Sequence, residues 1–133
     1  MLTDIGANLA HDSFDDDLDD VLDRAANAGV ERIVVTGSSI DSNDRAHALA
    51  GRYANLYCTA GVHPHHADDY TDTMHATLRQ QMSRPAVRAA GECGLDYFRN
   101  YATPDAQARA FEHQLALAVE FGLPVFGHQR DAH

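Results

Sequence analysis

The sequence predicts a parallel α/β fold, with about five β-strands and four crossover helices, as in the N-terminal half of an eight-stranded α/β barrel. Apolar strand-like runs alternate with amphipathic helical segments in units of about 30 residues, which is typical of a parallel sheet with helical crossovers. Polar side chains gather directly after the predicted strands, where parallel α/β folds bind ligands. The 133 residues are enough for one domain, 1–133, but too few for a closed eight-stranded barrel, which typically needs about 250 residues.

The first half of the chain is expected to hold three strands separated by two helices. The strands are predicted over Leu2–Ile5, Arg32–Thr36 and Leu56–Ala60. Ser13 and Asp16 have the spacing of a capping box and predict the start of the first helix, which Gly29 should end. A second helix is expected over Ser42–Tyr53.

The second half continues the same alternation. A helix is expected over Thr73–Met82, with strands over Ala86–Ala90 and Leu123–Phe126. The last helix has the clearest boundaries. Thr103 is a candidate N-cap, Pro104 follows at the first helical position, and Gly122 is the expected stop.

Composition restricts the classes of function. The formal net charge is −10, and all 10 cationic side chains are arginine. A broad basic surface for nucleic acid is therefore excluded, and a phosphate substrate would have to be held locally, by a metal ion and a few arginines. The 2 cysteines, Cys58 and Cys93, form no CxxC pair. The absence of a disulfide framework indicates a reducing, cytoplasmic location. The sequence also has no signal-like apolar segment and no run long enough to span a membrane, so no membrane contact is expected.

Candidate site residues follow four of the predicted strands. They are Asp4, Asn8, His63, His65, His66, Glu92, Asp96, His128, Arg130, Asp131 and His133. Glu92 and His128 follow adjacent strands and predict a divalent-metal site with mixed oxygen and nitrogen ligands. An ion pair between Glu92 and an arginine is the alternative, but the flanking Gly91 and Gly94 favour close approach of a ligand.

Two further residues keep two interpretations each. His63 could act in the site, as a metal ligand or as a general acid or base, because imidazole titrates near neutral pH; the alternative is a loop histidine bonded to the backbone. Arg130 could hold a phosphate bidentately or pair with Asp131. His65 is expected at the surface.

Five stretches of the chain match motifs of one enzyme family, in order and at family spacing. They are Asp4–Leu9, Thr59–His65, Gly91–Tyr97, Ala110–Leu115 and Pro124–Ala132. On these stretches the chain resembles the TatD family of metal-dependent deoxyribonucleases, in the amidohydrolase-like branch of TIM barrels. The resemblance covers the whole chain and implies the front half of a TIM-type barrel.

The resemblance also implies roles for individual residues. Glu92 and His128 would be metal ligands, His63 would belong to the active site, and Asp4 lies where the first-strand motif begins. Many members read Asp-x-His-x-His there, whereas this chain has Gly6 and Asn8 at the two histidine positions. The TatD subgroup resembles this variant form, which favours one well-occupied metal with Asn8 near the substrate. The family pattern continues beyond residue 133 with a further histidine and a metal-binding aspartate.

The implied activity is hydrolysis of DNA phosphodiester bonds, as an exonuclease acting on strand ends. The resemblance favours Mg²⁺ as the cofactor, with Zn²⁺ or Mn²⁺ as alternatives, and substrate contacts from Asn8, His65 and Arg130. Two other hypotheses stay open. One is an amidohydrolase-like or lactonase-like hydrolase of a small substrate. The other is a non-catalytic half-barrel that self-associates. Under the nuclease hypothesis, the 133 residues alone are expected to be incomplete and weakly active or inactive, and a missing C-terminal half would complete the site.

Overall fold

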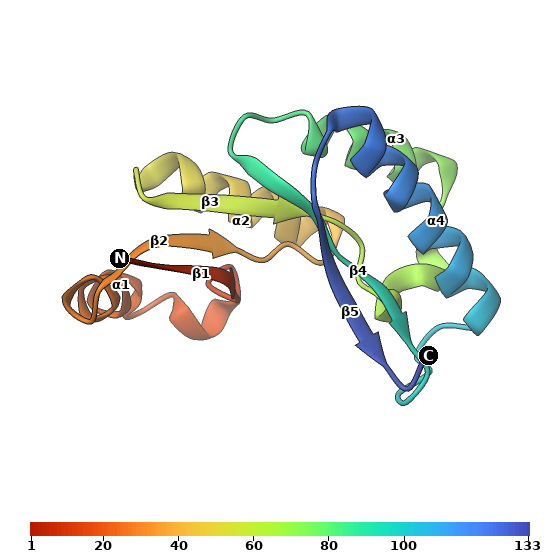
Figure 1. The fold of residues 1–133 in the computed structure, drawn as a ribbon, viewed down its shortest axis with the longest axis horizontal. Coiled ribbons are helices and arrows are strands. Elements are labelled where there is room, and N and C mark those ends of the chain that lie inside the picture. The colour runs from red at the N-terminus through yellow and green to blue at the C-terminus, as the bar shows by residue number, and fades with distance from the viewer.

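The computed structural model describes all 133 residues and confirms the parallel α/β half-barrel. Its one sheet has five parallel strands in the order β1-β2-β3-β4-β5. The strands are β1 (Leu2–Ala7), β2 (Val30–Val35), β3 (Leu56–Ala60), β4 (Val87–Asp96) and β5 (Val125–Arg130). Figure 1 shows the sheet turning strongly between β1–β3 and β4–β5, as part of a barrel wall does.

Four helices connect successive strands. They are α1 (Leu18–Asn27), α2 (Ile40–Arg52), α3 (Asp72–Met82) and α4 (Pro104–Phe121). Two short 3₁₀ helices, η1 (Asp12–Phe14) and η2 (Pro64–Asp69), lie in the loops after β1 and β3. The main core lies between the strands and these helices; Val35 and Cys58 of the sheet are fully buried with Leu78 of α3. No helix has the length and apolarity needed to cross a membrane.

The boundaries of α4 agree with the sequence prediction. The Thr103 side chain accepts a hydrogen bond from the Ala106 N–H at 3.2 Å, and Pro104 stands in the first turn. Gly122 ends the helix at φ 64°, in the left-handed region that favours glycine. Local capping chemistry thus decides where this helix begins and ends.

The predicted start of α1 is wrong. Ser13 lies in η1, where its backbone N–H donates to the His11 ring at 3.1 Å. That contact favours a 3₁₀ turn over a capping box, and α1 begins only at Leu18 after Asp17, which makes no side-chain cap bond. Gly29 does follow the end of α1, at φ 90°.

Strands β4 and β5 extend further than predicted. β4 runs through Glu92 to Asp96 because its backbone stays paired with β5, from Ala90 opposite Val125 to Asp96 opposite Arg130. Gly94 makes this possible: a Cβ there would lie 2.0 Å from the His128 carbonyl oxygen. Glu92 and His128 are therefore carried by paired strands rather than by loops.

Candidate active site

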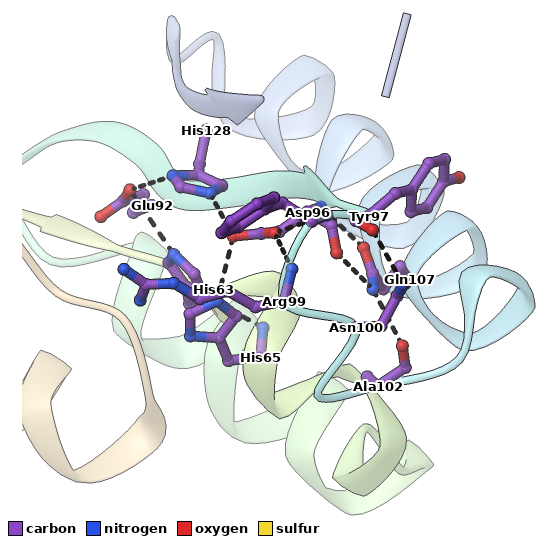
Figure 2. Close-up of polar contacts among 11 residues, drawn as sticks. His63, His65, Glu92, Asp96, Tyr97, Arg99, Asn100, Ala102, Gln107 and His128 are labelled. Carbon is purple, nitrogen blue, oxygen red and sulfur yellow. Dashed lines mark hydrogen bonds and ion pairs between the residues drawn. The ribbon is translucent and has the colours of Figure 1, made fainter. Parts of the chain in front are cut away.

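Three polar side chains converge at the carboxyl ends of neighbouring strands (Figure 2). His63 follows β3, Glu92 lies in β4 and His128 lies in β5. Glu92 Oε1 is 3.2 Å from His128 Nδ1 and 3.7 Å from His63 Nε2. Glu92 and His128 therefore point into one site, as the sequence predicted.

The donor set of this group fits a metal ion. One ligand atom from each of the three residues lies within 4.8 Å of the other two. Ligands held about 2.0–2.2 Å from one ion are no more than about 4.4 Å apart, and both contacts of Glu92 are within that limit. A carboxylate oxygen beside imidazole nitrogens suits a divalent cation.

Asp96, which the sequence predicted only as a polar residue after a strand, contacts two histidines of the site. It is 1% exposed, and its Oδ2 lies 2.9 Å from His128 Nε2 and 3.1 Å from His65 Nε2. Its Oδ1 accepts the backbone N–H groups of Phe98 and Arg99. The Arg99 N–H is the main reason that the pKa of Asp96 lies well below its usual range, against the effect of burial. Asp96 is thus a fixed carboxylate.

This carboxylate orients His128 for metal binding. When His128 Nε2–H donates to Asp96, the Nδ1 lone pair faces Glu92. Metal-binding histidines almost always donate their second ring N–H to a carboxylate, carbonyl or water in this way. The contacts therefore support His128 as a ligand.

His63 is oriented differently. Its Nδ1 accepts the backbone N–H of His65 at 3.1 Å, so the neutral ring carries its proton on Nε2, toward Glu92. Burial, with a smaller effect of His65, lowers the pKa of His63 to about 3, so the ring is neutral at pH 7. The backbone bond that the sequence left open is present, and a proton on Nε2 favours a proton or hydrogen-bond donor at the site over a metal ligand.

A pocket of about 470 Å³ opens beside the site and is lined by His63 and Glu92, whereas His128 and Asp96 are not part of its lining. Its lining comes from the five strands and the loops that follow them: Gly6, Asn8, Thr36, Ser38, His63, His65, His66, Glu92, Arg99 and Phe126. Asn8 and His65, the two residues expected to contact the substrate, both line this pocket. The expectation of a surface position for His65 is wrong, because its side chain is 20% exposed and bonded to Asp96.

Two predicted site residues, Asp4 and Arg130, belong neither to this lining nor to the group of three possible metal ligands. The exposed carboxylate of Asp4 accepts the Gly6 N–H at 3.0 Å, and Asp4 does not join the three clustered ligand groups. Arg130 is exposed, with its guanidinium carbon 5.7 Å from the centre of the Phe98 ring, and forms no ion pair with Asp131. Arg99, which the sequence analysis did not single out, is the arginine that lines the pocket.

Two buried amides of α4 hold the strand ends in place. Gln107 accepts the Asp96 N–H at 2.8 Å and donates to the Asp96 carbonyl at 3.1 Å. Gln114 forms the same pair of bonds with Val62, which precedes His63. The sequence could have indicated this role, because Gln107 and Gln114 are seven residues apart on a predicted amphipathic helix. That spacing puts both side chains on one face of the helix.

The fold and the site together define a class: α/β-barrel proteins with a metal-binding centre at the carboxyl ends of their strands. Within that class, the family model described as "TatD related DNase" matches residues 3–133. The chain belongs to this family, which confirms the resemblance seen in its motifs.

Individual relatives agree with this assignment. The chain is 51% identical over 130 residues to the 3'-5' ssDNA/RNA exonuclease TatD of Cronobacter turicensis, covering 98% of this chain and 49% of that protein. Identity to the protein of the same name from Enterobacter lignolyticus is 48%, over 98% of this chain and 50% of the relative. The chain thus spans about half the length of the curated relatives it matches.

Solved structures share the fold. The Escherichia coli K12 TatD homolog YJJV superposes with a TM-score of 0.91 at 33% identity, covering 99% of this chain and 52% of that chain. A hydrolase TatD family protein from Entamoeba histolytica gives a TM-score of 0.89 at 28% identity, covering 98% of this chain and 50% of its own.

Proposed function

We propose that the full-length protein is a metal-dependent exonuclease that hydrolyses phosphodiester bonds of single-stranded nucleic acid from the 3' end. The observation that carries this proposal is the Glu92–His128 pair, which Asp96 orients beside the pocket that Glu92 lines. The 51% identical relative is named as a 3'-5' ssDNA/RNA exonuclease, which supports the direction and the substrate class.

The proposed cofactor is a divalent ion held by Glu92 and His128, with Mg²⁺ as the working ion. When bound, it would polarise a phosphoryl oxygen and offset the charge that develops during hydrolysis. Carboxylate ligands suit Mg²⁺ and Mn²⁺, whereas imidazole suits Zn²⁺, so the mixed donor set keeps Zn²⁺ and Mn²⁺ as alternatives for a metal-replacement assay.

The other residues would act on the substrate. Glu92 supplies the negative charge of the metal centre, and Asp96 keeps His128 in the required tautomer. The neutral His63 ring presents Nε2–H toward the same centre and would donate a hydrogen bond to a phosphate oxygen or to the leaving group. Asn8 lines the pocket and can hydrogen-bond the nucleotide beside that phosphate.

The test uses full-length protein and a single-stranded DNA labelled at its 5' end. We expect Mg²⁺-dependent shortening from the 3' end, loss of activity with a chelator, and loss with Glu92→Gln, which removes the anionic ligand. Glu112→Gln, an exposed position on α4, is the matched control and should retain activity. Degradation by pure protein that is unaffected by Glu92→Gln would contradict the proposal. Lactone hydrolysis without nuclease activity would favour the small-substrate alternative.

A further inference from the structure

The loop between β4 and α4 carries a guanidinium with no anionic partner. The Arg99 side chain lines the pocket with His63 and Glu92, and Figure 2 shows it running from the loop toward these two residues. The Arg99 guanidinium takes part in none of the ion pairs of the structure. Its backbone N–H donates to Asp96 Oδ1 at 3.0 Å, which ties the base of this side chain to the carboxylate that orients His128.

The acidic charge of the chain makes an arginine at the pocket important for binding phosphate. Residues 1–133 carry a net charge of −10 and so repel a polyanion, which means that this part of the protein must attract phosphate by local contacts. A guanidinium can bind two phosphate oxygens at once. Arg99 is the only arginine that lines the pocket, so it is the side chain placed to hold a backbone phosphate beside the metal centre.

The same loop exposes an aromatic ring next to the site. Tyr101 is 66% exposed and meets His65 edge-on, with ring centroids 4.7 Å apart. Phe98 is equally exposed, but the guanidinium of Arg130 lies over its ring. Exposed aromatic rings beside a phosphate contact are how proteins bind single strands without regard to sequence.

The loop is also held in shape. Asn100 Nδ2 donates to the Tyr97 carbonyl at 2.7 Å, and Gln107 Nε2 donates to the Ala102 carbonyl at 2.9 Å. Together with the two N–H bonds to Asp96 Oδ1, these contacts keep the backbone of residues 97–102 in place before any ligand binds. A preformed loop loses less entropy when a strand binds.

We infer that residues 97–102 form the strand-binding element of the protein, in which Arg99 holds a backbone phosphate and Tyr101 stacks on a base. The inference rests on the proposed function and names the part of the chain that recognises single-stranded nucleic acid. It assigns to Arg99 the role that the sequence suggested for Arg130.

The test measures binding of a short fluorescent single-stranded DNA to the full-length protein, with Glu92→Gln present throughout to prevent cutting. Arg99→Gln should weaken binding about tenfold and reduce the slope of log K against log salt by about 0.7, the value for one phosphate contact on a single strand. Arg109→Gln makes the same charge change at an exposed position of α4 and should alter neither quantity.

The aromatic contact is tested in the same assay. Tyr101→Ala should weaken binding at least about fivefold with an unchanged salt slope, because stacking is not a charge contact. Tyr101→Phe keeps the ring and should retain affinity. In the cutting-competent protein, Arg99→Gln and Tyr101→Ala should mainly raise KM.

The outcomes separate the inference from the proposed function. Mg²⁺-dependent cutting that needs Glu92, with unchanged DNA affinity in Arg99→Gln and Tyr101→Ala, would overturn the inference and leave the proposed function standing. Neither cutting nor DNA binding by the unmodified protein would overturn both. Weakening by Arg109→Gln equal to that by Arg99→Gln would show a general charge effect and would also overturn the assignment of Arg99.

Discussion

Two imidazoles of the site differ in chemistry because their ring nitrogens have different partners. His128 can donate Nε2–H to the Asp96 carboxylate, which leaves Nδ1 available to a metal ion. His63 accepts a backbone N–H at Nδ1, which places its proton on Nε2. His128 is therefore suited to binding a metal ion, whereas the neighbouring His63 is suited to donating a hydrogen bond.

This difference predicts that two matched substitutions will have different effects. His128→Gln should weaken binding of the divalent ion to the full-length protein, because it removes a ligand. His63→Gln should leave metal affinity nearly unchanged and lower kcat by about 10²–10⁴-fold, the usual contribution of a positioned acid or base. Calorimetric metal titration and steady-state kinetics measure the two effects, with the exposed His113→Gln as control. Equal loss of metal affinity in both variants would make His63 a ligand.

At the scale of elements, helix α4 holds the backbone at the ends of two strands in position through side-chain hydrogen bonds. Gln107 and Gln114 lie on one face of the helix, and each forms two hydrogen bonds with a buried backbone segment, at Asp96 and at Val62. Those segments adjoin the loop of Arg99 and the ring of His63. One helix therefore sets the spacing between two parts of the site that lie on different strands.

We expect Gln114→Leu to destabilise the protein and to lower activity. It would leave the buried N–H and carbonyl of Val62 without their partner, at a cost of about 1–3 kcal/mol for each unsatisfied group. Thermal unfolding of the full-length protein gives the stability change, and kcat reports the displacement of His63. Gln80→Leu, on the exposed side of α3, should change stability by no more than about 0.5 kcal/mol. Equal effects of the two substitutions would contradict the bracing role.

At the scale of the whole molecule, the sheet of residues 1–133 has two open edges. β1 and β5 each pair with one neighbour only. Apolar side chains on these strands face solvent: Leu2 is 61%, Ile5 65% and Val125 41% exposed. Unpaired edges with apolar side chains favour pairing with further polypeptide.

Residues 1–133 expressed by themselves are therefore expected to self-associate. Light scattering coupled to size exclusion should give a mass above the 14.5 kDa of one chain. A charged substitution on the exposed edge, Ile5→Lys, should shift the distribution toward the monomer, whereas Val119→Lys, on the exposed side of α4, should not. A stable monomer at high concentration would contradict this expectation.

The sequence by itself determined the alternation of strands and helices, the boundaries of α4, the family, and the position of Glu92 and His128 on adjacent strands. These depend on periodicity, capping and motif spacing, which act over short stretches of chain. It did not determine the start of α1, where a contact from His11 replaced the expected cap.

Only the tertiary structure decided how the site residues are used. Asp96 became the carboxylate that orients His65 and His128, and Arg99 rather than Arg130 came to line the pocket. The tautomer of His63 and the bracing by Gln114 likewise depend on contacts made in the folded chain. The direction of a side chain and its hydrogen-bond partners follow from packing between segments that lie tens of residues apart, and no local pattern in the sequence records that packing.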